Sequence, residues 1–442
     1  MPRIPDELAS AMDQLIDPHV GIVRRVRQIR RAPGAPNFFH FAAEPCNTAA
    51  FTRQRASAIT GAAAADRARA VFKAVGEAVE RYCSAIYDVD ELPLSTAATA
   101  AFPCVEPSEF ALFSAAQYDS PGFPWVPFTR ETPLRWTPAT DVRSDEIWNL
   151  PAALVFMPYP YHQGTGDSPI VQPTSAGVAW HSSPEGAALA GAYEVVERDA
   201  LAIAWQARLS PPQIRLETLD DECYDLAQRF EEARSSLYLL DLTMGHGIPT
   251  VIAAVRNRQP ERPALVLAAA ASLDPGEAAR DALEKLAHQC HRVQQLWSRS
   301  PPAPAVSGDE FDDVVDQHDH LRLHSDHANA HLAEFLFSSS RRVELEGVRD
   351  LPTGDHGSDL RLVADKVGAV GHRLLVADLT SADVRELGLS VARVVIPGFH
   401  PLFSGHRIRA LGGRRLWEVP QRLGYQALDP TQGDNPAPHP SP

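Results

Sequence analysis

Two stretches of this 442-residue chain decide the prediction of its fold: KAVGEAVERYC (73–83) and TSAGVAWHSSPEGAALAGAYEVVERDA (174–200). Each contains two glutamates three residues apart, with an arginine directly after the second: Glu77, Glu80 and Arg81 in the first, Glu194, Glu197 and Arg198 in the second. At 3.6 residues per turn, the glutamates of each pair share one face of a helix, and the arginine lies within one turn of them. The flanking positions are apolar or small in both, which predicts helices that face a buried cleft.

Two such helices, packed face to face, would bring four carboxylates and two guanidiniums together. Carboxylates at that density repel one another unless cations lie among them. Mg²⁺ prefers oxygen ligands, and arginine binds phosphate oxygens in pairs. One copy of the pattern alone would favour a solvated, salt-bridged helix face, but two copies with apolar flanks favour a Mg²⁺–triphosphate site. Lys73 and a third helix that carries Arg280 and Glu284 are expected at the same pocket.

The chain around these stretches alternates between helical and strand-like patterns. Helices are predicted at 60–87, at 183–206, where Ser183 suits the N-cap and Pro184 the first turn, and at 275–298. Thr380 and Asp383 predict a capping box for a short helix toward residue 386. Strands are predicted at 153–157, 237–242, 250–255, 264–270, 374–377 and 391–396. This alternation indicates an α/β or α+β fold.

The overall composition excludes several classes of protein. With 44% hydrophobic residues and a formal net charge of -15, the chain is globular and lacks the basic stripe of a nucleic-acid binder, and it is not attracted to anionic membranes. The arginine-rich segment 24–31 is interpreted as the solvated face of a helix. Five cysteines without a CxxC pair argue against a disulfide framework or a structural zinc site. No signal peptide or membrane-spanning run is visible, so a cytoplasmic protein is expected.

Four segments, in order, resemble the YcaO family. They are KAVGEAVERYC (73–83), the second stretch quoted above, DPGEAARDALEKLAHQ (274–289) and ADLTSADVRELGLSVARVVIPGFHPL (377–402). The resemblance implies a YcaO-type fold, with ATP and Mg²⁺ bound between the glutamate-bearing helices. It implies Mg²⁺ ligands at Glu77, Glu80, Glu194, Glu197 and, near the helix start, Glu185, and ATP contacts at Lys73, Arg81, Ser182, Arg198, Arg280 and Glu284.

The end of the chain bears on the type of reaction. It reads Asn435-Pro436-Ala-Pro438-His-Pro440-Ser-Pro442, which matches twice the PxPxP motif typical of azoline-forming YcaO proteins. The resemblance implies that the terminal carboxylate of Pro442 reaches the active site and helps to move protons. Composition alone would favour a Pro-rich tail over 427–442 that forms no packed element. We expect instead that the proline rings hold residues 434–442 in an extended, polyproline-like path that enters a cleft.

Two positions depart from the family pattern. A metal-binding glutamate is usual eight residues before Glu194, where this chain has Gly186, and an asparagine is usual four residues earlier, where it has Ser182. Glu185 lies about a quarter-turn or more from the face of the other glutamates. The site therefore either uses Glu185 or holds one ion fewer.

The resemblance implies an ATP-dependent enzyme that closes Cys, Ser or Thr side chains of a ribosomal precursor peptide into thiazoline or oxazoline rings. Thioamide or amidine formation by the same ATP chemistry is one alternative. A catalytically weak scaffold in a modification complex is another. The expected partners are the leader-containing peptide, an E1-like or winged-helix leader-binding protein, and a flavin dehydrogenase of the same pathway; a homodimer is also considered.

The expected organisation is an N-terminal segment (1–55), a YcaO catalytic domain (56–426) and the Pro-rich tail (427–442). A loop is predicted at 299–306. The segment 308–331 holds five histidines among five aspartates, at spacings that match no standard metal site. We interpret it as a solvated helix and loop.

Overall fold

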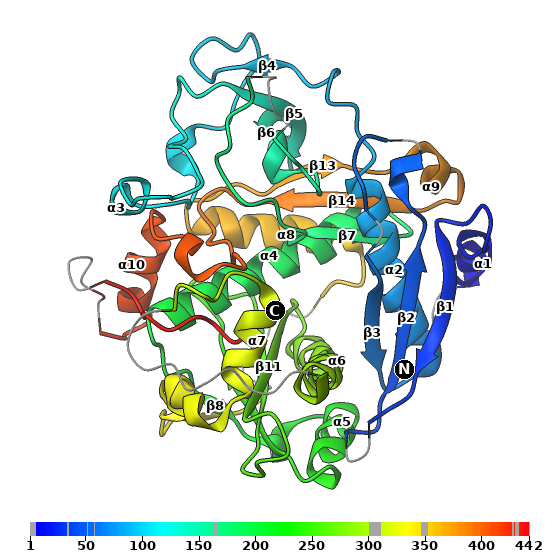
Figure 1. Cartoon of the computed structure of the whole chain (residues 1–442), viewed down its shortest axis with the longest axis vertical. Helices are drawn as coiled ribbons and strands as arrows, with labels where there is room; N and C mark the ends of the chain where they lie inside the picture. Colours follow the sequence, from blue (N-terminus) through cyan, green and yellow to red (C-terminus); the bar gives the residue numbers. More distant parts are fainter. Residues whose placement is uncertain are drawn as a thin grey trace.

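The computed structural model describes residues 6–32, 35–50, 52–56, 58–161, 166–299, 311–345, 352–426, 428 and 433–441. Three β-sheets and the helices packed on them make up the described chain (Figure 1). The predicted mixture of helices and strands, an α/β or α+β fold, is confirmed. The loop predicted at 299–306 lies almost entirely outside the described residues.

The first sheet is antiparallel and contains β1 (Val23–Ile29), β2 (Phe39–Pro45) and β3 (Thr60–Ala64) in that order. The interpretation of the arginine-rich segment as a helix is therefore wrong. It is strand β1, because Val23, Val26 and Ile29 suit a strand and the backbone pairs with β2. The helix predicted at 60–87 also begins later than expected. Residues 60–64 form β3, and α2 (Arg67–Ser84) begins after Asp66, whose side chain accepts a hydrogen bond from Arg69 N.

The second sheet has the order β11-β10-β9-β8-β12. Its strands are β8 (Gln213–Ile214), β9 (Ser236–Asp241), β10 (Thr250–Arg256), β11 (Leu265–Ala271) and β12 (Arg342–Val343). The strands predicted at 237–242, 250–255 and 264–270 are confirmed within one or two residues. Two helices pack on this sheet, α5 (Asp221–Glu232) and α6 (Pro275–Arg299), and α6 also contacts β3 of the first sheet. Helix α6 is therefore the link between the two sheets.

The third sheet has the order β4-β5-β13-β14-β7, with β6 paired to β5. Its strands are β4 (Leu94–Ser95), β5 (Leu134–Asp141), β6 (Ile147–Pro151), β7 (Val178–His181), β13 (Leu375–Asp378) and β14 (Ser390–Val395). The long helix α4 (Pro184–Gln206) and α8 (His356–Ala369) pack together, and α4 also contacts β14 and β7. Ser183 caps α4 as predicted, through a hydrogen bond from Gly186 N.

Two local predictions about the third sheet are wrong. Residues 153–157 are not a strand, because β6 ends at Pro151 and the chain turns into η3 (Ala152–Leu154). The short helix α9 (Ala382–Glu386) follows Ser381 rather than Thr380. The hydroxyl of Thr380 donates to Val391 O in the neighbouring strand, which removes it from the cap.

The remaining elements are short helices and 3-10 turns outside the sheets. They are α1 (Asp6–Leu15), η1 (Thr48–Ala50), η2 (Pro107–Glu109), α3 (Ala115–Tyr118), η4 (Leu216–Thr218), α7 (Gln317–Ser325), η5 (His327–Phe337), η7 (His406–Ile408) and α10 (Arg414–Arg422).

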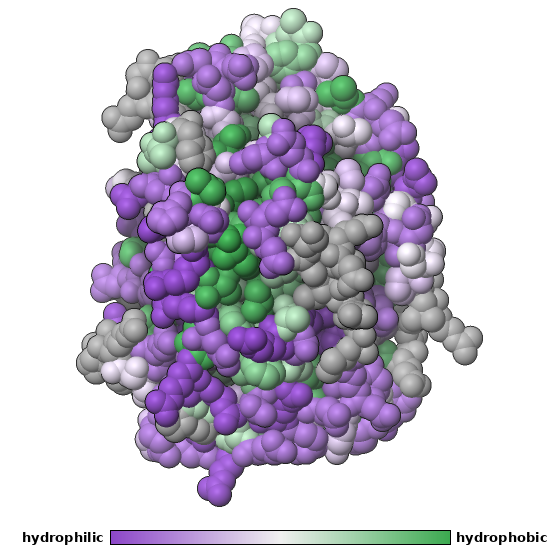
Figure 2. Space-filling model, turned by 90° about the vertical axis from the view of Figure 1, so that its right-hand side faces the viewer, coloured by the Kyte–Doolittle hydropathy of each residue, from purple (hydrophilic) through white to green (hydrophobic). Residues whose placement is uncertain are grey.

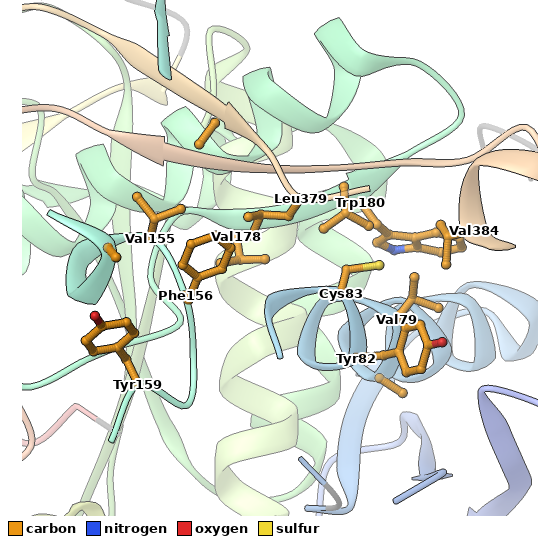
Figure 3. Packing of buried hydrophobic residues seen from close by; sticks show 14 of the residues in the cluster. Val79, Tyr82, Cys83, Val155, Phe156, Tyr159, Val178, Trp180, Leu379 and Val384 are labelled. Atoms are coloured by element: carbon orange, nitrogen blue, oxygen red, sulfur yellow. The ribbon is translucent and has the colours of Figure 1, made fainter. Parts of the chain in front are cut away.

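Helix α2 is fixed by close packing against β7 (Figure 3). The ring centroids of Phe72 and Trp180 lie 4.6 Å apart. A Cβ atom at Gly76 would lie 1.8 Å from Trp180 Nε1, so this approach requires glycine. Val79 and Cys83 are fully buried in the same cluster. The polar residues of α2 are therefore held in one direction, away from this core.

The face on the right of Figure 1 is mostly hydrophilic, and apolar residues gather in its middle and toward its top (Figure 2). Among the described residues, no helix is both long and apolar enough to span a membrane.

Candidate active site

A cavity of about 730 Å³ lies where α2, α4 and α6 meet. Its lining includes most of the charged residues that the sequence predicted: Lys73, Glu77, Glu194, Glu197, Arg198 and Glu284. Helices α2 and α4 both pack against β7, so this strand sets the separation of the two glutamate pairs. Residues more than 200 positions apart in the chain thus form one charged pocket.

The walls of this glutamate pocket are made of small residues at the edges of two sheets. Strand β3, at the edge of the first sheet, contributes residues 61–63, and β11, at the edge of the second, contributes Ala268 and Ala269. Glycine and alanine leave the strand backbones within reach of a bound molecule.

Glu80 lies next to the pocket, and its pKa is affected by two neighbouring carboxylates. Burial, together with the nearby charges of Glu194 and Glu77, raises the pKa of Glu80 to about 8. One of its oxygens accepts a hydrogen bond from Trp180 N at 3.3 Å. The crowding of three carboxylates leaves a local excess of negative charge that a bound cation would neutralise.

Each glutamate pair is accompanied by its arginine. Arg81 Nη2 lies 3.5 Å from Glu77 Oε1. Arg198 lies 3.4 Å from Glu194 and 3.9 Å from Glu197. Burial lowers the pKa of Arg198, but the two carboxylates raise it by more, so the net shift is upward. The other oxygen of Glu194 accepts from Gly177 N at 2.9 Å, so its carboxylate is fixed by the turn before β7.

Helix α6 closes the pocket through a second ionic cluster. The buried Glu284 accepts hydrogen bonds from Lys73 Nζ at 2.6 Å and from Arg69 Nε at 2.9 Å. The same two cations contact Asp281 Oδ1 at 3.1 and 2.7 Å. Lys73 and Glu284 are therefore neighbours, and they tie α2 to α6.

Two ionisable residues of the pocket lining were not predicted. Lys285 Nζ forms an ion pair with Glu197, and His288 lines the cavity beside it. Burial and nearby Arg292 lower the pKa of His288 to about 4, so its ring is neutral at pH 7. The spacing of 284, 285 and 288 along one helix could have revealed both, because these positions share a face.

Five predicted residues of the described chain do not line the glutamate pocket. Two of them, Glu80 and Arg81, contact Trp180 and the pocket residue Glu77, respectively. The other three are Arg280, Ser182 and Glu185. Arg280 pairs with Glu277 at 3.1 Å and with Glu222 of α5 at 3.5 Å, on another side of α6. Ser182 lies 3.4 Å from His181 Nδ1, and Glu185 is exposed at the start of α4. The expectation that Arg280 converges with the glutamates is therefore wrong. Successive residues of a helix are rotated by about 100° around its axis. Viewed along α6, Arg280 therefore lies roughly 40° to one side of Glu284, and Asp281, Lys285 and His288 lie on the opposite side of Glu284.

The space at Gly186 is occupied by a neighbouring imidazole ring. A Cβ atom at Gly186 would lie 2.3 Å from His181 Nδ1. That nitrogen accepts a hydrogen bond from Ser183 N at 3.3 Å, and the ring also packs edge-on against His356. A longer side chain at position 186 would require His181 to move.

The tail runs from α10 toward the middle of the molecule (Figure 1), and most of its residues from Asn435 to Ser441 are buried. Ser441 lines the pocket, and Arg198 Nη1 lies 3.4 Å from its hydroxyl. Three successive tail carbonyls accept hydrogen bonds from buried rings: Ala437 O from Trp205, Pro438 O from His324 and His439 O from His320, at 2.6, 2.7 and 2.7 Å. Arg409 holds Asp434 with two hydrogen bonds.

The interpretation of 308–331 as a solvated helix and loop is therefore wrong for part of that segment. His320 and His324 of α7 are buried because they donate to the tail, which composition alone did not reveal. Ser441 lies at the pocket as expected, and residues 434–441 form no helix or strand. The polyproline-like path of these residues stays a prediction. Pro442 itself, whose carboxylate was expected to take part in proton transfer, lies outside the described residues.

The donor set suits Mg²⁺ bound together with phosphates. Within the described ranges, no group of three or more His, Cys, Asp or Glu side chains is arranged to hold a metal by itself. Mg²⁺ in nucleotide sites is commonly bound by one or two carboxylates, with the remaining positions filled by phosphate oxygens and water. Crowded glutamates beside arginine and lysine match that mode of binding.

Comparisons with known proteins agree with this chemistry. A family model described as "YcaO cyclodehydratase, ATP-ad Mg2+-binding" matches residues 61–400. An uncharacterized protein of Methanothermobacter thermautotrophicus is 28% identical over 288 residues, which cover 63% of this chain and 70% of that protein.

Two solved structures share the fold. A heterocyclase in complex with substrate and cofactor has a TM-score of 0.80 and 24% identity, and the match covers 99% of this chain but 57% of the heterocyclase. YcaO from Methanopyrus kandleri, bound with AMPPCP and Mg²⁺, has a TM-score of 0.66 and 19% identity over 92% of this chain and 94% of its own. Because the family model covers most of its length, this chain belongs to the YcaO family, whose cofactors are ATP and Mg²⁺.

Proposed function

We propose that this protein uses ATP to activate backbone amides of a ribosomal precursor peptide and closes Cys, Ser or Thr side chains into thiazoline or oxazoline rings. One observation carries the proposal. Carboxylates from two separate glutamate-arginine helices meet at one pocket together with the guanidinium of Arg198, and the end of the proline-rich tail reaches the same pocket. Family membership supplies the class of chemistry.

The pocket residues have distinct roles in this proposal. Glu77, Glu80, Glu194 and Glu197 would hold Mg²⁺ together with the triphosphate. Arg81 and Arg198 would neutralise phosphate oxygens as charge develops during transfer. Lys73 is held by Glu284, so it acts as a fixed positive charge at the rim.

The reaction itself is a dehydration driven by phosphoryl transfer. The side-chain thiol or hydroxyl of the substrate attacks the preceding carbonyl carbon, and the carbonyl oxygen takes the γ-phosphoryl group of ATP. Loss of that oxygen as phosphate, with the amide proton, leaves the ring and ADP. The carboxylate of Pro442 is the proposed proton acceptor, because the tail brings Ser441 to within 3.4 Å of Arg198.

Two other functions remain as candidates on specific grounds. Thioamide or amidine formation would use the same pocket with a different nucleophile, but the PxPxP tail favours ring closure. A catalytically weak scaffold is favoured by Gly186, since His181 fills the space of a further ligand. Peptide-dependent release of ADP would exclude the scaffold.

Substitution of single glutamates tests the site. Glu197→Gln removes a negative charge, and Glu80→Gln removes a carboxyl group that would ionise when a cation binds, since its pKa is raised to about 8. Both changes keep the shape of the side chain, so both should weaken Mg²⁺-dependent binding of AMPPCP tenfold or more and abolish peptide-dependent ATP turnover. Calorimetry measures the first effect, and ADP release measures the second. Glu277→Gln is the matched control, because Glu277 lies on α6 in an ion pair with Arg280 and does not line the pocket. Normal turnover in both site variants would mean that ATP binds elsewhere.

The proposed partners are the leader-containing peptide and a separate leader-binding protein of the E1-like or winged-helix type, with a flavin dehydrogenase acting on the rings afterwards. Self-association is a further proposal. A disordered leader gains from a dedicated docking surface, because its ordering cost is offset there. Full ring-forming activity of the purified chain alone would refute the need for a leader-binding partner.

A further inference from the structure

A second cavity, of about 640 Å³, lies behind the glutamate pocket and is lined mainly by apolar side chains. Its walls include Phe110, Leu154, Val195, Ile396 and Phe403. They come from the chain directly after η2, from η3, from α4 and from the segment that follows β14. We refer to it as the apolar pocket.

Arg198 belongs to the lining of both cavities. Its guanidinium contacts Glu194, Glu197 and the Ser441 hydroxyl on the glutamate side. Val195, the residue after Glu194 on α4, faces the apolar side. A molecule in the apolar pocket would therefore lie directly beside the proposed phosphate site.

The apolar pocket also contains buried polar atoms that lack a partner. Arg393 is 5% exposed and donates from Nη1 to Thr174 O at 2.7 Å. Its Nε atom, and Nδ1 of the buried His400, have no hydrogen-bond partner among the described residues. Both side chains line the cavity. Buried polar groups are nearly always hydrogen-bonded, so these atoms point to a ligand that has polar groups as well as an apolar part.

Peptides have this combination of groups. A backbone carbonyl could accept from Arg393 Nε, and an apolar side chain could fill the cavity. The amide to be activated must lie within reach of the transferred phosphoryl group, and Arg198 is the residue that separates the two cavities. The charges near Arg198 and the apolar walls behind it thus suit two adjacent parts of one substrate.

We infer that the apolar pocket binds an apolar side chain of the substrate peptide, next to the residue that is cyclised. The inference rests on the proposed function, and it adds a preference for Leu, Ile, Met or Phe beside the reacting Cys, Ser or Thr. Leu154 is a specificity-determining residue in this arrangement, because it is half-buried and lines the cavity.

The test uses the full chain with Mg²⁺ and AMPPCP and four short synthetic peptides. The peptides are identical except at the position before a central Cys, which holds Leu, Phe, Ala or Asp. The dissociation constant of each is measured by fluorescence anisotropy. The Leu or Phe peptide should bind about tenfold or more tightly than the Asp peptide.

Three variants of one residue locate the effect. Leu154→Trp fills the cavity and should remove the preference for Leu and Phe. Leu154→Ala enlarges it and should shift the preference toward Phe. Leu154→Met keeps the volume nearly constant and serves as the matched control. Thermal melting shows whether each variant is folded, and the Ala variant keeps the test valid when the Trp variant is not.

Each outcome has a definite meaning. Equal affinities for all four peptides in the unmodified protein, or an unchanged preference in both the Trp and the Ala variants, would overturn the inference. A loss of AMPPCP affinity in Leu154→Trp would also overturn it, because the cavity would then hold the nucleotide. Failure of the proposed function looks different: ADP release would be independent of peptide, while the peptide affinities would still differ.

Discussion

Lys285 and His288 enter the glutamate pocket from α6, within a turn or so of Glu284. The sequence predicts Glu284 and Arg280, four residues apart on one helix, at the pocket, and only Glu284 lines it. Arg280 instead forms an ion pair with Glu222 of α5. The identity of a charged residue is visible in the sequence. Its partner on a helix distant in the chain is not.

Lys285→Met should weaken binding of Mg²⁺–AMPPCP at least tenfold, although Lys285 was not one of the predicted site residues. Lys285 is an ion-pair partner of Glu197 in the pocket, so its removal leaves that carboxylate without one of its cations. Calorimetry on the variant measures the change. Lys366→Met is the control, because Lys366 does not line the pocket. Equal losses in the two variants would mean that the effect is not specific to the site.

Gly186→Ala should destabilise the protein by about 1–3 kcal/mol, the range for overpacking a well-packed site. The new Cβ atom would lie 2.3 Å from His181 Nδ1, and the ring is held by Ser183 N. Denaturant unfolding measures the loss. The double variant His181→Ala/Gly186→Ala should recover part of it, because the clash is gone. Additive losses in the double variant would show that the His181 ring is not the obstacle.

The proline-rich tail is the element for which the sequence was most ambiguous. Composition favours a tail without a packed structure, and the PxPxP motif favours a docked one. The structure resolves this for 433–441, because Trp205, His324 and His320 supply donors to three successive carbonyls. Prolines leave their own carbonyls free, and the matching donors lie on α4 and α7. No local pattern in the tail could have indicated them.

Acid should release the tail. Burial lowers the pKa of His324 to about 4, against an ordinary value of 6.5, and it also lowers the pKa values of His320 and His439. Because His324 Nε2 donates to Pro438 O, the added proton would enter at Nδ1, which has no hydrogen-bond partner among the described residues. The undocked tail leaves this ring free to bind the proton. The free energy that favours tail docking is therefore greatest above pH 6.5 and decreases as the pH falls toward 4. The difference between the pKa values of His324 in the two states limits its share of this decrease to about 3 kcal/mol.

Amide hydrogen exchange of residues 433–441 measures tail docking across this range. Protection should fall between about pH 6.5 and pH 4 in the unmodified protein. His324→Gln keeps a donor but does not titrate, so it should reduce the pH dependence. Constant protection of the tail throughout the range would contradict this explanation.

Errors in the predicted elements share one physical cause. Residues 60–64 and 23–29 have patterns compatible with a helix, yet both are strands because β2 lies between them and pairs with each. Residues 153–157 have a strand-like composition, but β5 is already paired with β6, which ends at Pro151. In all three cases the outcome depends on which strands pair, and not on the local preference of the segment alone. The helices α4 and α6 were predicted well because their caps and apolar periodicity are local signals.

The fold class of the whole molecule follows from the alternation of helices and strands, but the arrangement of three sheets does not. Helix α6 lies between β11 of the second sheet and β3 of the first, and α2 and α4 both contact β7 of the third. The glutamate pocket therefore depends on all three sheets at once (Figure 1). The sequence indicated which carboxylates matter. Their common location depends on contacts between segments far apart in the chain.

The central claim is that the glutamate pocket transfers a phosphoryl group from ATP to the oxygen of a substrate amide. The most direct measurement uses a Cys-containing precursor peptide whose carbonyl before the Cys carries a heavy isotope of oxygen, with its leader-binding partner present. Mass spectrometry then follows the label. The account predicts that the label appears in inorganic phosphate in step with ring formation, and that Glu197→Gln abolishes both while Glu277→Gln does not. Release of the labelled oxygen as water would contradict the claim. Labelled phosphate formed by the Glu197→Gln variant would also contradict it.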